Sequence, residues 1–269
     1  MRKYTKAIQD ARIARDSEAI KKALKDYDDA LEKYIPVLMM QGKIYWDMEN
    51  YEQVEKIFRQ SAEFCSEHES WKLNVAHTFF MQENKFKDAI RYYEPIVKRH
   101  AEDLLSVTAI VLANLCVAYI MTSQNVEAEE LMKCIEKEEE KIIYIEPTKQ
   151  VYHLCIVNLV IGTLYCSKGN FEFGISRVMK SLDPLNRKLG TDTWFYAKRC
   201  FLALLETLAK HMLMIKDAEF NEILAFLDAC DYHGKKIKAD FDPVNEKVNM
   251  VSDESRLLKM MFLKLRDGE

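Results

Sequence analysis

The stretch Ile161–Val178, IGTLYCSKGNFEFGISRV, decides the fold, because it holds three of the seven glycines in the 269-residue chain. Glycines gathered in this way either form a loop that binds phosphate or let two helices approach closely. A phosphate-binding loop follows a β-strand and opens a helix. No strand pattern precedes this stretch, and Gly162 and Gly174 fall in the middle of helical patterns. We therefore interpret these glycines as packing positions.

The spacing of this stretch recurs three times earlier in the chain. Its key positions are separated by 3, 4, 2, 3 and 4 residues, in the order Gly162, Tyr165, Gly169, Phe171, Gly174 and Val178. The same intervals separate Gly42, Tyr45, Glu49, Tyr51, Val54 and Phe58; His77, Phe80, Asn84, Phe86, Ala89 and Tyr93; and Cys116, Tyr119, Ser123, Asn125, Ala128 and Met132. These are the intervals of the tetratricopeptide repeat, a helix–turn–helix unit. The sequence thus predicts an all-α fold, a tetratricopeptide-repeat α-solenoid in which helical hairpins form a right-handed superhelix.

Small residues in each repeat allow its two helices to approach, and aromatic residues fill the space beside them. The repeat-packing residues that we predict are Gly42, Tyr45, Tyr51, Phe58, Phe80, Phe86, Ala89, Tyr93, Tyr119, Ala128, Gly162, Tyr165, Gly169, Phe171 and Gly174. Between the helices, Asn50, Asn84 and Gly169 are expected to adopt the left-handed backbone that often ends a helix.

The repeats divide the chain into four parts. Residues 1–33 are expected to form two leading helices, the remnant of a preceding repeat block, broken near Asp16 with Ser17 as an N-cap. Residues 34–182 hold four degenerate repeats, at about 34–68, 70–103, 109–142 and 155–188. Residues 189–234 are predicted to form a helical hairpin that caps the solenoid, and residues 235–269 a loop and a last helix. The run EKEEEK, Glu136–Lys141, is interpreted as a solvated helix end.

Composition argues against several functional classes. The net charge of −4, with both signs interspersed, gives no reason to expect nucleic acid as a partner. The longest apolar runs fall far short of the roughly 18 residues that a membrane span needs. Seven cysteines without a CxxC pair indicate buried thiols in a reducing compartment rather than a disulfide framework.

The sequence also lacks a catalytic or metal-binding pattern. The six histidines are scattered and form no HExxH motif. Cys155, Cys166 and Cys200 each lie in an apolar helical pattern, where a thiol is normally inert. We expect no enzyme activity, metal, cofactor or small-molecule substrate. A thiol enzyme that uses one of these cysteines remains the alternative, and selective labelling of one thiol would support it.

The first helix of each repeat is expected to line the inner wall of the superhelix. The peptide-groove residues that this register predicts are Met39, Lys43, Trp46, Asn74, Thr78, Met81, Val117, Ile120, Met121, Leu159 and Thr163. An apolar wall with a tryptophan and methionines suits an extended apolar or proline-rich peptide. A co-chaperone that clamps a C-terminal carboxylate would need several basic residues here, and the inner positions offer one lysine and one asparagine, since Ala113 and Val117 occupy the third repeat.

Long strings of this sequence resemble one family in particular. DYDDALEKYIPVLM, GKIYWDMENYEQVEKIFRQSAEFC, WKLNVAHTFFMQENKFKDAI, YHLCIVNLVIGTLYCSKGNFEFGISRV and KLGTDTWFYAKRCFLALLE are similar to the tetratricopeptide repeat protein thirty, or fleer, family. Its members are subunits of intraflagellar transport complex B. The resemblance covers the chain from Met1 to about Gly234 and is looser in the tail, where ESRLLK still fits.

The resemblance implies a role that composition does not show. It implies that this chain corresponds to the C-terminal part of longer proteins and lacks a block of N-terminal repeats. It further implies a scaffold of cilia and cytoplasm, at the axoneme and basal body, whose superhelix wraps a proline-rich segment of a neighbouring complex B subunit, the one named for fifty-two kilodaltons. The family is also linked to ciliary kinesin and to tubulin polyglutamylation, and no residue is assigned to either. The alternative is a cytosolic repeat scaffold or co-chaperone with another peptide partner.

Overall fold

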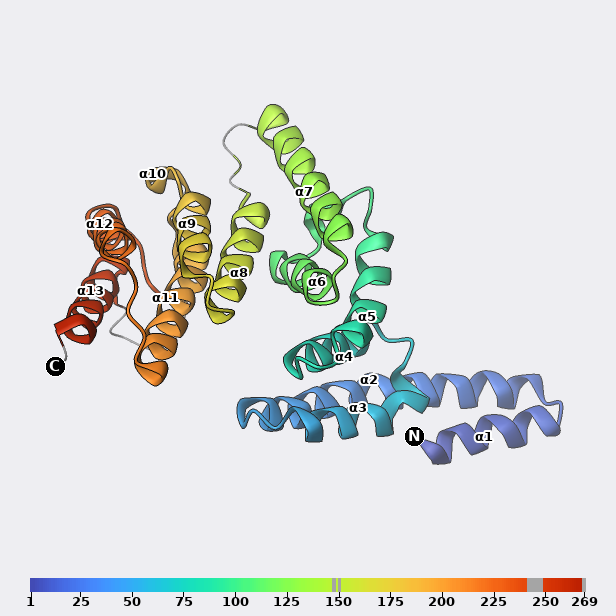
Figure 1. The fold of residues 1–269 in the computed structure, drawn as a ribbon. Coiled ribbons are helices and arrows are strands. Elements are labelled where there is room, and N and C mark those ends of the chain that lie inside the picture. The colour runs from blue at the N-terminus through green and yellow to red at the C-terminus, as the bar shows by residue number, and fades with distance from the viewer. Residues whose placement is uncertain (147–148, 150, 241–248, 268–269) are drawn as a thin grey trace. The chain divides into compact units, whose positions relative to one another are not determined.

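The computed structural model describes residues 1–146, 149, 151–240 and 249–267 (Figure 1). Within these ranges the secondary structure is helical, apart from one isolated bridge between Lys238 and Met250. The chain forms two compact units, Met1–Lys98 and Arg99–Glu269. The all-α class predicted from the sequence is confirmed. The division falls inside the second expected repeat, at about 70–103, near its end, and the domain boundaries drawn from the sequence stay predictions.

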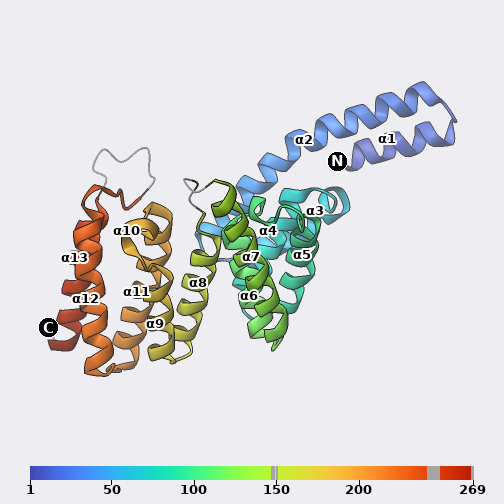
Figure 2. The ribbon, with the colours of Figure 1, turned by 90° about the horizontal axis from the view of Figure 1, so that it is seen from above.

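The first unit consists of five helices. They are α1 (Arg2–Ile13), α2 (Ser17–Asp47), α3 (Tyr51–Cys65), α4 (Glu69–Met81) and α5 (Phe86–Arg99), whose last residue crosses the division. α1 folds back along α2, and α3 packs on both α2 and α4 (Figures 1 and 2). The core of this unit is formed by Ile35, Leu38, Val54, Ile57, Phe58, Cys65, Trp71 and Val75.

The second unit stacks further helical hairpins. After a short 3-10 turn at Leu104–Ser106, its helices are α6 (Ala109–Met121), α7 (Asn125–Ile145), α8 (His153–Ser167), α9 (Phe171–Ser181), α10 (Leu185–Lys188), α11 (Thr191–His211), α12 (Asp217–His233) and α13 (Val251–Asp267). α8 contacts α6, α7, α9 and α11, and therefore lies at the centre of the unit (Figure 2).

α8 and α9 approach each other most closely where Gly162 faces Gly174. A Cβ atom built on Gly162 would lie 2.6 Å from Cγ2 of Val178 and 3.0 Å from the carbonyl oxygen of Gly174. One built on Gly174 would lie 2.5 Å from Sγ of Cys166 and 2.7 Å from the carbonyl oxygen of Gly162. Backbone atoms of both helices occupy the space that any side chain would need. Neither glycine lies in a loop.

A left-handed residue ends the first helix of each repeat, and the sequence analysis placed it wrongly in two cases. The positive φ angles are at Glu49 and Glu83, not at Asn50 and Asn84, and at Ser123 and Gly169 in the later repeats. The amide of the residue after the left-handed one usually closes the turn: Asn50 N donates to Tyr45 O and Asn170 N to Tyr165 O. This is the Schellman arrangement, which satisfies carbonyls that the helix end leaves free.

Side-chain caps begin α2 and α3 in the first unit, whereas α7 and α9 begin without one. Asn50 is the N-cap of α3, and its Oδ1 accepts the amide of Gln53 at 3.2 Å. Asp16, not Ser17 as expected, caps α2 and accepts the amides of Glu18 and Ala19. An ionised carboxylate is a stronger acceptor at a helix N-terminus than a hydroxyl.

α2 is one continuous helix through the boundary expected at residue 33. Pro36 lies inside α2 and does not end it. The second leading helix and the first helix of the first repeat are therefore a single element. Its outward face carries Val37, Met40, Ile44 and Met48, each at least 60% exposed and one helical turn from the next.

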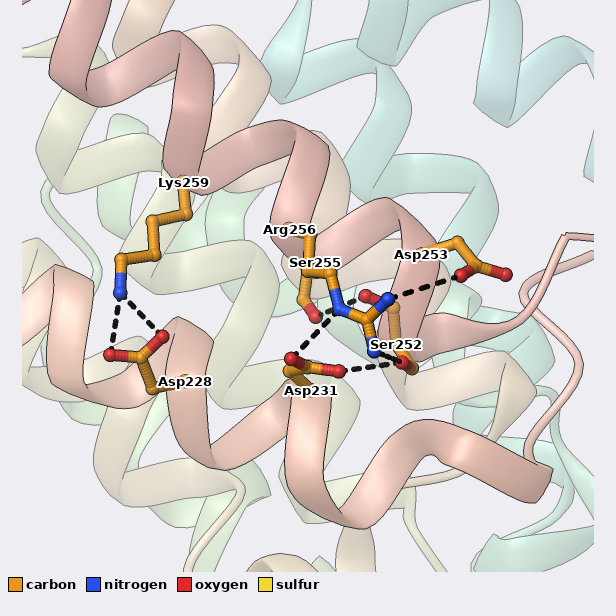
Figure 3. Close-up of polar contacts among 7 residues, drawn as sticks. All are labelled: Asp228, Asp231, Ser252, Asp253, Ser255, Arg256 and Lys259. Atoms are coloured by element: carbon orange, nitrogen blue, oxygen red, sulfur yellow. Dashed lines mark hydrogen bonds and ion pairs between the residues drawn. The ribbon is translucent and has the colours of Figure 1, made fainter.

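α11 and α12 occupy most of residues 189–234, where the sequence predicted a capping hairpin, and α13 of the tail packs against both. The capping hairpin itself stays a prediction. Ion pairs and hydrogen bonds join α12 to α13 along one side (Figure 3). Asp228 accepts from Nζ of Lys259 at 2.5 and 2.7 Å, and Asp231 accepts from Nε of Arg256 at 2.9 Å and from Oγ of Ser252 at 2.6 Å. The hydrogen bonds from Arg256 and Ser252 lower the pKa of Asp231 to about 2.

Glu55 joins two segments of the first unit. Its carboxylate accepts from Nζ of Lys85 at 2.5 Å, from Nε2 of Gln82 at 3.0 Å and from the guanidinium of Arg59 at 2.7 Å. Burial acts to raise the pKa of Glu55, but the hydrogen bonds from Lys85, Gln82 and Arg59 outweigh it and lower the pKa to about 2. Glu55 therefore ties α3 to the turn that connects α4 with α5.

Replacing Gly174 by alanine should destabilise the second unit by about 2–3 kcal/mol, because a methyl group would force α8 and α9 apart. Urea unfolding followed by circular dichroism measures this loss. Gly190→Ala is the matched control, since a Cβ there meets only Oγ1 of Thr193 at 3.9 Å. Equal stability of the two variants would contradict the close approach.

Replacing Glu55 by glutamine should lower the stability of the first unit at pH 7 by about 1–2 kcal/mol. The pKa of Glu55 is lowered in the folded chain, so its contribution is complete above about pH 4.5 and is lost as the pH falls toward about 2. Urea unfolding at pH 7 and pH 3 should therefore show a smaller difference at the lower pH. Glu63→Gln, an exposed change on the same helix, should show little effect at either pH.

Candidate functional site

A hollow of about 700 Å³ lies where the N-terminal ends of α6, α8 and α11 meet in the second unit. Its apolar and aromatic lining comes from Ile110, Ile142, Tyr152, Ile156 and Tyr196. Asp103, Asp192 and Lys149 also line it, so its carboxylates outnumber its lysine by one. Such a surface, mostly apolar with a few placed polar groups, is typical of a binding site.

The groove residues predicted for the first unit differ in their exposure. Lys43 and Met81 are exposed, while Met39, Trp46 and Asn74 are half-buried. Thr78 is 1% exposed and donates its hydroxyl to the carbonyl of Asn74, so it contributes to packing. Trp46 packs edge-on against Tyr51, with ring centroids 5.1 Å apart.

The groove residues predicted for the second unit lie on the same helical faces as the hollow. Ile110 and Val117 are two turns apart on α6, and Ile156 and Thr163 are two turns apart on α8. Ile120, Met121 and Thr163 are half-buried, whereas Val117 and Leu159 are 4% and 0% exposed and pack between helices. The groove role of all these residues stays a prediction.

Tyr152 and Tyr196 line the hollow and were missed by the sequence analysis. Tyr152 immediately precedes α8, and its hydroxyl donates to the carbonyl of Arg187 at 2.9 Å. Tyr196 lies on α11, beyond the last repeat, where the interval pattern gives no register. The spacing of Tyr152 could have pointed to it, because Tyr152 lies one turn before Ile156 on the helical face that also carries the predicted groove residue Thr163.

Glu139 has a structural role that the sequence analysis did not assign. The run Glu136–Lys141 was expected to be a solvated helix end, and Glu139 is instead half-buried and accepts the amide of Leu154 at 2.9 Å. A carboxylate from α7 therefore caps the N-terminus of α8. Burial raises the pKa of Glu139, and the backbone hydrogen bonds from Leu154 and His153 oppose that rise.

Burial and hydrogen bonds shift the pKa values of His153 and of the cysteines that the thiol-enzyme alternative names. His153 bonds the carbonyl of Val107 through Nε2 at 3.1 Å, and burial lowers its pKa. Burial raises the pKa of Cys155 to about 11, and a hydrogen bond to Cys200 together with burial raises the pKa of Cys166. A thiol with a raised pKa is a poor nucleophile at neutral pH, which applies to Cys155 and Cys166. The hydrogen bond with Cys166 lowers the pKa of Cys200, whose side chain is buried.

The part of the chain that the structure describes contains neither a candidate metal centre nor a helix that could span a membrane. Within it, His, Cys, Asp and Glu form no group of three or more that could hold a metal ion. Its helices include none that is both long and apolar enough to span a bilayer.

Comparison with known proteins identifies the family of this chain, which the geometry of the hollow does not. A family model described as the intraflagellar transport protein 70 C-terminal domain matches residues 1–269. The chain belongs to the intraflagellar transport protein 70 family. This confirms the family that the sequence resemblance indicated.

Relatives in this family are similar to the chain over nearly its whole length. Intraflagellar transport protein 70A of Danio rerio is 63% identical over 268 residues, which are 97% of this chain and 41% of that protein. Intraflagellar transport protein 70B of Homo sapiens is 61% identical over 271 residues, 98% of this chain and 41% of the relative. The chain thus spans about two fifths of the length of these relatives of the intraflagellar transport protein 70 family.

The cysteines of this chain should differ sharply in reactivity. Cys134 is exposed on α7, and the other six thiols are buried. Titration of the folded chain with a thiol-reactive disulfide reagent should label one thiol rapidly, and Cys134→Ser should remove that fast phase. A second fast thiol that survives the substitution would contradict this assignment and favour a thiol enzyme.

Proposed function

We propose that this chain is part of a non-enzymatic scaffold subunit of intraflagellar transport complex B. Membership of the intraflagellar transport protein 70 family supports the transport role, because the relatives carry that name. In this proposal the chain binds an extended proline-rich segment of a neighbouring complex B subunit. The observation that carries the peptide-binding part is the hollow lined by Tyr152, Tyr196 and Ile110.

The hollow has the chemistry that proline-rich segments require. Such segments are already extended, so they lose little conformational freedom on binding, and they dock on aromatic side chains. Tyr152 and Tyr196 supply ring surfaces, and Ile110 and Ile156 supply the apolar floor between them. Asp103 and Asp192 would pair with basic residues that flank the proline-rich run. The half-buried groove residues Ile120, Met121 and Thr163 would extend the contact along α6 and α8.

The proposal also includes a cellular location and a role in ciliary transport. A subunit of this complex acts in cilia, at the axoneme and basal body, and in the cytoplasm from which cilia are assembled. Contacts with ciliary kinesin and an effect on tubulin polyglutamylation would follow from transport by the assembled complex. The alternative is a cytosolic tetratricopeptide-repeat scaffold or co-chaperone with another peptide partner, and family membership favours the transport role.

Co-expression with the proline-rich segment of the fifty-two-kilodalton-type subunit tests the proposal. Size exclusion should give a stoichiometric complex, and the bound chain should melt at a higher temperature than the free chain. Tyr196→Ala should weaken binding by about tenfold or more, because a buried aromatic contact carries on the order of 2 kcal/mol.

Leu202→Ala is the matched control for this experiment. Leu202 lies on the same helix, α11, is 39% exposed and does not line the hollow, whereas Phe195 packs edge-on against Tyr196 and is therefore unsuitable. Substitution of Leu202 should leave binding unchanged. A stable chain that ignores the segment, or equal effects of the two substitutions, would contradict the assignment of the hollow.

A further inference from the structure

A second cavity, of about 420 Å³, lies on the other side of the α8 N-terminus, between α7 and α9. Glu139 of α7 forms one wall, and Arg177 and Lys180 of α9 with Lys188 of α10 form the opposite wall. Phe173, Leu154 and Cys155 form an apolar floor. Tyr152 contributes to this cavity and to the hollow described above, so only the α8 N-terminus separates the two.

Arg177 is the central charge of this cavity and has no carboxylate partner among the described residues. Its Nε donates to Oδ1 of Asn158 at 3.1 Å, a second nitrogen approaches Sδ of Met132 at 3.8 Å, and the guanidinium stacks 5.8 Å from the ring centroid of Phe173. The side chain is half-buried, so its charge is partly removed from water. A half-buried guanidinium without a counter-ion favours an anion from outside the chain.

Lys180 and Lys188 increase the positive charge of the same wall. Neither forms an ion pair with a described side chain, unlike Lys198, Lys216 and Lys259 of the same unit, which are paired with Glu254, Glu172 and Asp228. Lys180 is exposed and Lys188 is half-buried beside the cavity, and Lys188 is close enough to Glu139 to act to lower the pKa of that carboxyl without forming an ion pair with it.

The acidic wall of the cavity is already engaged. Glu139 accepts the amide of Leu154 and so uses its carboxylate on the α8 N-terminus. Glu136, one turn earlier on α7, is exposed and does not line the cavity. An anionic ligand would therefore lie along the α9–α10 wall, away from α7.

The spacing of the cations distinguishes a peptide from a single phosphate. Arg177 and Lys180 are one helical turn apart, which separates their Cβ atoms by about 5–6 Å. Alternate side chains of an extended peptide are about 7 Å apart, close to that spacing. Cations arranged along a wall match carboxylates on alternate residues of an extended peptide, and the apolar floor offers a place for one apolar side chain.

We propose that this cavity binds an extended acidic peptide segment of a partner protein, with its carboxylates on Arg177, Lys180 and Lys188 and an apolar side chain over Phe173. The cavity is separate from the hollow assigned to a proline-rich segment. Each surface can therefore fail its own test without affecting the other.

Fluorescence anisotropy of the folded chain tests this proposal. The probe is a short fluorescein-labelled peptide of glutamates around one leucine, and the same peptide with glutamines is the negative probe. The glutamate peptide should bind, and it should bind more weakly as salt rises. The double variant K180E/K188E should lose about tenfold or more in affinity, since two charge-assisted contacts become repulsive.

Lys168→Glu is the matched control, because Lys168 is exposed at the far end of α8 and does not line the cavity. It should leave binding unchanged, and circular dichroism should show that all variants fold. Equal binding of the glutamine peptide, or an equal loss in Lys168→Glu, would overturn the proposal. So would binding of a phosphoserine peptide by a chain that ignores the glutamate peptide, since that result would indicate a phosphate site.

Discussion

The contact of α8 with α9 at Gly162 and Gly174 sets the geometry of the second unit. Each helix places a carbonyl oxygen where a side chain of the other would lie, so the two backbones meet without intervening side chains. This approach brings Cys166 and Val178 into the core, and α11 then packs on α8 with Phe201 and other buried side chains. The same core continues to Phe262 of α13, so the C-terminal hairpin and the repeats share one hydrophobic cluster.

Because α8 is held in this way, the surfaces on both sides of its N-terminus are also fixed. Glu139 caps α8 from α7, which links the extended helix of one repeat to the first helix of the next. Tyr152 then lies between the acidic, aromatic hollow and the basic cavity. Carboxylates outnumber cations in the lining of the hollow and cations outnumber carboxylates in the lining of the cavity, so the two surfaces at this helix end differ in charge.

The sequence was sufficient for the fold class and insufficient for the details that depend on tertiary contacts. Interval spacing predicted the helical hairpins, because small and aromatic residues recur wherever two helices meet. It did not predict that α2 continues through Pro36, or that Asp16 caps this helix in place of Ser17. It could place Val117 and Leu159 on a helical face, but their burial depends on the depth of packing by neighbouring helices. Tyr196 lies outside the repeats, so no register pointed to it.

The left-handed turn at the end of each first helix has a consequence for how these repeats can diverge. Its residue is a glutamate in two repeats, a serine in one and a glycine in one, and Met212 adopts the same backbone after α11. Backbone hydrogen bonds hold the turn in the last case too, where Leu213 N donates to Leu208 O. The geometry of the turn therefore depends on backbone hydrogen bonds and does not require a particular side chain. Repeats of this kind can therefore lose all sequence similarity at their turns while their helical hairpins keep the same shape.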